Sequence, residues 1–318
     1  MFKLPGAPSP SADLHELADF MELHAWREGA ISEQRICDAL GRDDDNEVQD
    51  GVESSDDDIA AKLEEVMLEI ERRVSACDGA YPFNLDRVGT VLRHNAADQS
   101  VRKEVYRYLL LATRLNMTEH DTHAGIDGTE LLEEVSACAL RGYLGADRAQ
   151  SLVFGTSATG SFKERVDQLI YRVGEGGRFK GKNTDDLQPA DAKLDVIAWV
   201  PFADSLPSKV VIFGQCKTGT NWKGELTQLQ PDKFTGLWMT NPFCHVPSRA
   251  FCIAEAASQT RWHHDATYAG ILFDRCRLAG LSFGLDADLF ERVQTWSAAA
   301  ISSFLLPARI TPRRNARS

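Results

Sequence analysis

The sequence lacks the features of a membrane protein and of a disulfide-stabilised secreted protein. Its 318 residues contain no apolar run near the ~20 residues of a membrane-spanning helix. The first residues, MFKLPGAPSPSADLHE, show no basic segment followed by an apolar stretch. The seven cysteines are scattered, with no CxxC pair and no His/Cys ladder at zinc-finger spacing. We therefore expect a cytoplasmic protein with neither a membrane span nor a structural zinc.

Motifs of several enzyme classes are also missing. The segment around Gly219 lacks the GK[ST] pattern of a nucleotide-binding loop, and no Ser/His/Asp or Cys/His order suggests a nucleophilic triad. His263 and His264 are adjacent, so on a helix they would face different directions and would not chelate one ion together. The remaining candidates for catalytic or metal-binding groups are carboxylate, amide and lysine side chains.

Charge divides the chain into two unequal parts. The whole sequence has a net charge of -12, but residues 151–318 hold 20 Lys+Arg against 16 Asp+Glu, and residues 1–150 hold 15 against 31. The second part is therefore net positive by 4 and the first net negative by 16. The length favours two domains, and we predict them at 1–150 and 151–318. Only the second has a charge suited to a polyanion such as DNA.

Helical periodicity dominates the first part. It predicts a pair of helices within 13–41 and three further helices at 59–74, 101–115 and 130–144, joined in part by an acidic, apolar-poor loop at 43–58. We therefore expect an all-α, acidic N-terminal domain that is either partner-binding or regulatory.

From about residue 150 the pattern alternates between helix and strand. Ser161 opens an amphipathic helix, and two β-branched runs at 196–200 and 210–213 predict adjacent strands. The pattern further predicts helical material near 226–234 and strands at 250–254 and 271–278. A closing helix is predicted from 286 to about 305. This order predicts an α/β domain with a mixed sheet flanked by helices.

Polar side chains at the ends of the two adjacent strands form the candidate site. Asp195 begins one strand, and the triplet Gln215-Cys216-Lys217 ends the next. Because side chains alternate along a strand, Gln215 and Lys217 point to one face and Cys216 to the other. If the two strands pair as a hairpin, Asp195 lies beside Gln215. Glu164, on the preceding helix, is a further candidate.

The segments LDVIAW and VVIFGQCKTGTNW resemble the signature of the PD-(D/E)XK nuclease superfamily, in which an acid precedes a strand-borne (D/E/Q)-x-K. The resemblance covers roughly residues 155–280. It implies an αβββαβ core, with Asp195 as the main metal ligand, Gln215 as the second ligand and Lys217 as the signature lysine. It gives Glu164 the first-helix ligand position.

The resemblance further implies a Mg²⁺-dependent deoxyribonuclease, with Mn²⁺ as a substitute ion. A neutral amide at Gln215 can still coordinate Mg²⁺, although a site with fewer carboxylates holds its ion more weakly. By analogy with this superfamily we expect a DNA endonuclease of antiphage defence or restriction. Its expected partners are DNA, a helicase, NTPase or sensor protein bound by the N-terminal half, and a second copy of the chain.

Several alternatives stay open at this stage. Glu164 also fits a capping box with Ser161, and Asp191 competes with Asp195 as a ligand. Residues near the site that could bind backbone phosphate are Lys180, Lys182, Lys223, Lys233 and Trp222. Two other functions are a catalytically inactive adaptor that keeps the nuclease fold, and a helix-turn-helix regulator centred on residues 13–41. The acidity of that region disfavours the regulator.

Overall fold

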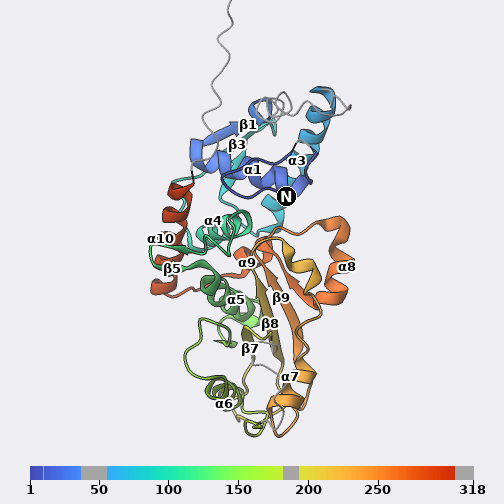
Figure 1. The fold of residues 1–318 in the computed structure, drawn as a ribbon, viewed down its shortest axis with the longest axis vertical. Helices are drawn as coiled ribbons and strands as arrows, with labels where there is room; N and C mark the ends of the chain where they lie inside the picture. Colours follow the sequence, from blue (N-terminus) through green and yellow to red (C-terminus); the bar gives the residue numbers. More distant parts are fainter. Residues whose placement is uncertain (10, 37–55, 182–192, 305–318) are drawn as a thin grey trace, which may run out of the picture.

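The fold is built on a five-stranded mixed sheet with helices on both faces. The computed structural model describes residues 1–9, 11–36, 56–181 and 193–304. The strands of the main sheet are β6 (Gln150–Val153), β7 (Val196–Trp199), β8 (Val211–Lys217), β9 (Ser248–Ile253) and β10 (Ile271–Phe273). Figure 1 shows them running along the long axis of the molecule. The predicted α/β class with a mixed sheet is therefore confirmed.

The strand order is β10-β9-β8-β7-β6. Strands β6, β7 and β8 pair antiparallel, whereas β8, β9 and β10 are parallel. Parallel neighbours need crossover connections. These contain α7 (Pro231–Trp238) between β8 and β9, and α8 (Gln259–Ala269) between β9 and β10. The expected hairpin of two adjacent strands is confirmed as β7 and β8.

The two faces of the sheet are covered by different helices. On one face, Val196 and Ile212 pack into the largest buried cluster together with residues of α5 (Gly128–Gly145). On the other, Ile197 and Phe213 pack against apolar side chains of α6 (Phe162–Val173) and α7. This alternation follows the two-residue period of the strands. It fixes the direction of the polar side chains that follow at the strand ends.

The N-terminal half contains strands as well as helices, so the all-α prediction for it is wrong. Its helices are α1 (Leu14–Glu28), α3 (Asp56–Ala76), α4 (Val101–Arg114) and α5. A small antiparallel sheet has the order β1-β3-β2, with β1 at Ala30–Ser32, β2 at Phe83–Leu85 and β3 at Val91–His94; β4 (Thr122–His123) pairs with β5 (Ile126–Asp127). These strands of two to four residues are too short to show a period.

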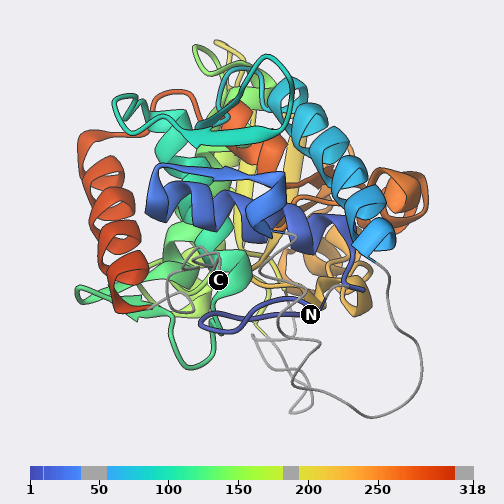
Figure 2. The same cartoon turned by 90° about the horizontal axis from the view of Figure 1, so that it is seen from above.

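Other predictions need smaller corrections. The segment 271–278 was expected as one strand, but β10 ends at Phe273, and Asp274 caps α9 (Arg275–Leu281) by accepting a hydrogen bond from the Arg277 N–H. Strand β6 and helix α8 were not predicted. The last helix, α10, spans Ala287–Ser303, and Figure 2 shows it at the side of the molecule away from α8. The acidic loop expected at 43–58 lies largely outside the described residues.

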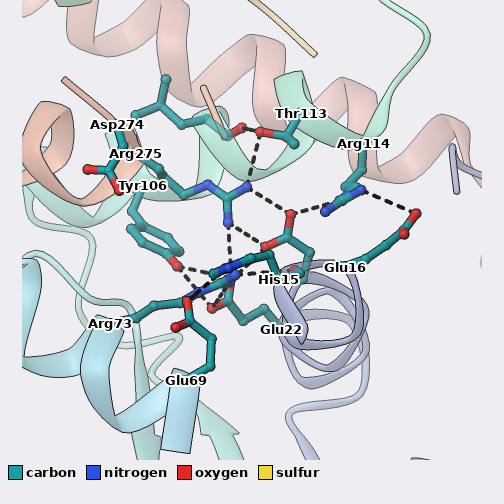
Figure 3. Close-up of polar contacts among 12 residues, drawn as sticks. His15, Glu16, Glu22, Glu69, Arg73, Tyr106, Thr113, Arg114, Asp274 and Arg275 are labelled. Atoms are coloured by element: carbon teal, nitrogen blue, oxygen red, sulfur yellow. Dashed lines mark hydrogen bonds and ion pairs between the residues drawn. The ribbon is translucent and has the colours of Figure 1, made fainter. Parts of the chain in front are cut away.

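A buried ionic network joins the two halves of the chain. Arg275 on α9 donates to both carboxylate oxygens of Asp19 on α1 at 2.7 and 2.9 Å. Arg73 and Arg114 also donate to Asp19, each at 2.7 Å. Figure 3 shows Arg73 and Arg275 extending toward Glu22 from different helices. These groups are almost fully buried, so each charge depends on its partners.

The domain boundary predicted at residue 150 remains a prediction, because elements on its two sides pack against each other. Helix α5, which precedes it, packs on β7 and β8, which follow it, and one buried cluster contains residues from both sides. Among the described residues, no helix is both long enough and apolar enough to cross a membrane.

Candidate functional site

The β7–β8 hairpin brings Asp195 beside Gln215. Val196 pairs with Gly214, so the next position along each strand places Asp195 opposite Gln215. The Asp195 N–H donates to the Gly214 carbonyl at 3.0 Å, and the Cys216 N–H donates to Asp195 Oδ2 at 2.7 Å. The backbone of β8 therefore fixes the Asp195 carboxylate at the end of the strand pair. The sequence predicted this juxtaposition.

Asp195, Gln215 and Lys217 line a cleft of about 490 Å³, which we call the Asp195 cleft. Its other walls come from α5, from the segment after β6, and from α6. Arg165 and Lys193 also line it and supply positive charge. The cleft lies where β7 begins and β8 ends, so polar groups from both strands meet there. Its size falls within the range of about 300–1,000 Å³ typical of ligand sites.

Gln215 is the most unusual group in the cleft. The residue is 1% exposed, and neither its Oε1 nor its Nε2 has a hydrogen-bond partner among the described residues. A buried polar group without a partner costs about 1–3 kcal/mol. A group retained at that cost needs an explanation in a ligand, an ion or ordered water. The amide oxygen of Gln215 is therefore suited to accept a partner from the cleft.

Lys217 is partly exposed and paired. Its Nζ lies 2.7 Å from Glu225 Oε2, with the two side chains 31% and 28% exposed. Glu225 immediately follows the short 3₁₀ helix η2 (Asn221–Gly224). An exposed pair of this kind contributes about 0–1 kcal/mol. Lys217 can therefore exchange Glu225 for an anionic ligand at little energetic cost.

A second carboxylate reaches the cleft from α5, and sequence reasoning missed it. Glu133 is 6% exposed and lies on the helix that packs against β7 and β8. It accepts hydrogen bonds from the N–H and hydroxyl groups of Thr156 and Ser157, at 2.7–3.0 Å. Glu133 thereby holds the segment after β6 against the cleft. The sequence shows only an acid at position 133 within the apolar pattern of 130–144, which does not by itself indicate the cleft.

The environment of Asp195 favours its neutral form. Burial raises the pKa of this carboxyl from 3.8 to about 7, and the negative charge of Glu133 adds to the rise. The hydrogen bond from the Cys216 N–H and the charges of Lys217 and Lys193 oppose it. A carboxylate that is desolvated and near a second acid gains from a cation in the same cleft.

The structure does not bring Glu164 into this cleft. Its Oε2 accepts from the Ser161 N–H at 2.7 Å, while the Ser161 hydroxyl accepts from the Glu164 N–H, which completes a capping box at the start of α6. Glu164 is exposed, and the hydrogen bonds from Ser161 lower its pKa. The expectation of Glu164 as a site residue is corrected: it caps the helix. Glu133 is the acid that a helix brings to the cleft.

The candidate phosphate-binding residues do not line the Asp195 cleft in the described part of the chain. Trp222 is buried and donates its indole N–H to Glu255 Oε2 at 2.5 Å, and Lys223 lines a different cleft. Lys180 and Lys233 are exposed and absent from the lining of the Asp195 cleft. Asp191 and Lys182 lie outside the described residues.

The donor groups of the Asp195 cleft fit a hard divalent ion. Within the described part of the chain, no group of three or more His, Cys, Asp or Glu side chains is arranged to hold a metal. The cleft instead offers the Asp195 carboxylate, the unpartnered amide of Gln215 and, close by, the carboxylate of Glu133. Mg²⁺ is held by one or two carboxylates and keeps several waters. These residues therefore match Mg²⁺ better than a metal that needs an all-protein cage.

Comparison of the chain with protein-family models, with curated proteins and with solved structures finds no match.

Proposed function

We propose that the protein is a Mg²⁺-dependent nuclease that hydrolyses phosphodiester bonds of DNA at the Asp195 cleft. The observation that carries the proposal is a buried Gln215 beside Asp195 whose amide has no hydrogen-bond partner among the described residues, with Lys217 on the same face of the strand end. Helix capping and core packing do not account for a buried amide that has no hydrogen-bond partner within the described part of the chain.

The topology supports the proposal. The resemblance to the PD-(D/E)XK superfamily implies the order αβββαβ. The chain has this order in helix α5, the antiparallel strands β6, β7 and β8, helix α7 and the parallel strand β9. Helix α6 is an addition between β6 and β7. In this arrangement α5 is the first core helix, so Glu133 takes the position that the sequence assigned to Glu164.

Each residue has a distinct role in the proposed reaction. Asp195 and Gln215 would hold the ion, and Glu133 orients the segment after β6 and adds negative charge that favours cation binding. A bound Mg²⁺ would polarise the phosphoryl oxygen and lower the pKa of a coordinated water. Lys217, released from Glu225, neutralises charge that develops on the phosphate. Arg165 and Lys193 in the cleft wall favour the approach of a polyanion.

The acidic N-terminal half is proposed to bind a protein partner such as a helicase, NTPase or sensor, consistent with a role in antiphage defence or restriction. The net charge of -16 over residues 1–150 supports a protein rather than a nucleic acid as its partner.

The first test is cleavage of plasmid DNA by the purified full-length chain with Mg²⁺ or Mn²⁺, and with EDTA. Lys217→Ala should reduce metal-dependent cleavage by about 100-fold, the scale of losing one group that stabilises transition-state charge. Lys163→Ala is the matched control, because Lys163 is an exposed lysine on α6, 64% exposed and paired with Asp167. This control should cut at the wild-type rate.

Binding of Mn²⁺ is measured in parallel, by calorimetry on the wild type and Asp195→Ala. Metal binding lost in Asp195→Ala, without DNA cleavage by the wild type, would indicate an adaptor that keeps the metal site. Equal cleavage by Lys217→Ala and the wild type would overturn the proposed site.

A further inference from the structure

The ion pair between Lys217 and Glu225 connects the Asp195 cleft to the segment that follows β8. Lys217 Nζ lies 2.7 Å from Glu225 Oε2. Lys217 lines the cleft, whereas Glu225 does not. Within the described part of the chain, no other acid lies within ion-pair distance of Lys217. The cation that the proposed reaction needs at the phosphate is therefore neutralised by a carboxylate from outside the cleft.

The backbone is fixed on both sides of Glu225. The Glu225 N–H donates to the Trp222 carbonyl at 2.9 Å, and the Gln228 N–H donates to the Glu225 carbonyl at 3.0 Å. The next residue, Leu226, is buried in the same apolar cluster as Trp222. Glu225 is consequently held within reach of Lys217, unlike an acid on a free surface segment.

The segment that carries Glu225 is anchored by distant parts of the chain. Trp222 in η2 is 2% exposed and donates its indole N–H to Glu255 Oε2 at 2.5 Å. The Gly219 N–H donates to the Ala112 carbonyl on α4 at 3.2 Å. The position of Glu225 is therefore set by tertiary contacts of its own segment, and not by the strand that carries Lys217.

The two side chains of the pair are nevertheless able to separate. They are 31% and 28% exposed, so water screens their attraction. A phosphate offers the same ammonium a full negative charge and several acceptor oxygens. Once phosphate displaces it, however, the Glu225 carboxylate stays close by, and the two negative charges repel each other. An anion that binds at Lys217 must therefore overcome both the lost ion pair and this repulsion.

We propose that Glu225 is an autoinhibitory residue, which holds the Lys217 ammonium until a DNA phosphate displaces it. This inference rests on the proposed nuclease function, because it concerns the lysine of the same site. In the resting protein Lys217 is paired with Glu225, and in the DNA complex the phosphate takes the place of the carboxylate. DNA offsets the cost through further phosphate contacts, which a small anion cannot make.

The test is DNA binding by Glu225→Gln, which keeps the size of the side chain and removes its charge. Affinity for a short duplex is measured by fluorescence anisotropy on the full chain in EDTA, so that no cleavage occurs. We expect the variant to bind about fivefold more tightly, which corresponds to about 1 kcal/mol. The plot of log affinity against log salt should also become steeper by up to about one, because phosphate binding no longer exposes a carboxylate.

The matched control is Asp167→Asn, which removes the acid of another lysine pair. Asp167 Oδ2 lies 2.6 Å from Lys163 Nζ on α6, and neither residue lines the Asp195 cleft. This control should bind DNA within about twofold of the wild type. Equal tightening in both variants would show a general effect of net charge and contradict the assignment of Glu225.

Cleavage in Mg²⁺ distinguishes inhibition from help in catalysis. Glu225→Gln should lower KM about fivefold, whereas a residue that positions Lys217 for the reaction would lower kcat when replaced. DNA binding without cleavage by the wild type would reject the nuclease function, and the affinities would still test Glu225. Equal affinity and salt dependence in the wild type and Glu225→Gln, or no DNA binding by either protein, would reject the autoinhibitory role.

Discussion

Replacing Asp195 by asparagine should stabilise the metal-free protein above neutral pH while removing its metal site. Burial raises the pKa of Asp195 from 3.8 to about 7, so the folded protein holds the proton more tightly than the unfolded chain. The ionised carboxylate therefore disfavours folding. This cost is absent below about pH 4, grows between about pH 4 and pH 7, and is complete above that range.

The magnitude follows from the size of the shift. A difference of about three pH units corresponds to about 4 kcal/mol, at 1.36 kcal/mol for each unit. Because Asp195 is partly exposed at the cleft, solvent screening reduces the effect, and we expect about 2 kcal/mol. Asparagine keeps an oxygen that can accept from the Cys216 N–H, so the hydrogen bond seen at 2.7 Å is retained.

The assay is urea denaturation of the wild type and Asp195→Asn, in EDTA, at about pH 5 and pH 8. The stability difference in favour of the variant should be larger at the higher pH. Asp288→Asn is a control, because Asp288 is 81% exposed and paired with Arg292, and its replacement should not stabilise the protein. A stability difference between wild type and Asp195→Asn that is the same at both pH values would refute a desolvation cost on the ionised Asp195 carboxylate.

Three further substitutions test the remaining assignments. Gln215→Glu should raise Mn²⁺ affinity about tenfold in calorimetry, because it adds a carboxylate to the donor set; unchanged affinity would exclude Gln215 as a ligand. Glu164→Ala should leave Mn²⁺ affinity and cleavage unchanged but lower the melting temperature, since it removes the side-chain acceptor of the capping box with Ser161; lost metal binding would restore Glu164 as a ligand. Arg275→Ala should cost about 3–5 kcal/mol in urea denaturation, because it leaves buried Asp19 short of a partner. The partly exposed pair of Arg292 and Glu134 is its control, and Arg292→Ala should cost about 1 kcal/mol or less.

The sequence by itself determined the elements that have a long and regular pattern. The apolar stripes at 59–74 and 101–115 predicted α3 and α4, and the β-branched runs predicted β7 and β8. The position of Asp195 beside Gln215 also followed from the sequence, because two adjacent strands of a hairpin leave few registers that bury their apolar faces. These features depend on contacts that are local or nearly local along the chain.

Only the tertiary structure decided which helix supplies an acid to the cleft. Ser161 and Glu164 form a capping box that is complete within four residues, so the local pattern was consistent with either role for Glu164. Glu133 reaches the cleft because α5 packs across β7 and β8, a contact between segments more than 50 positions apart in the sequence. No periodicity within α5 encodes that contact.

The same reason explains the strands of the N-terminal half and the network at Asp19. Strand β1 forms because β3, far along the chain, completes its hydrogen bonds, and strands of two to four residues carry too few residues to show alternation. Arg275 and Asp19 lie 256 residues apart, and their opposite charges compensate each other within the buried network. The sequence determines local periodicity and charge, whereas the pairing of distant buried groups is decided when the chain folds.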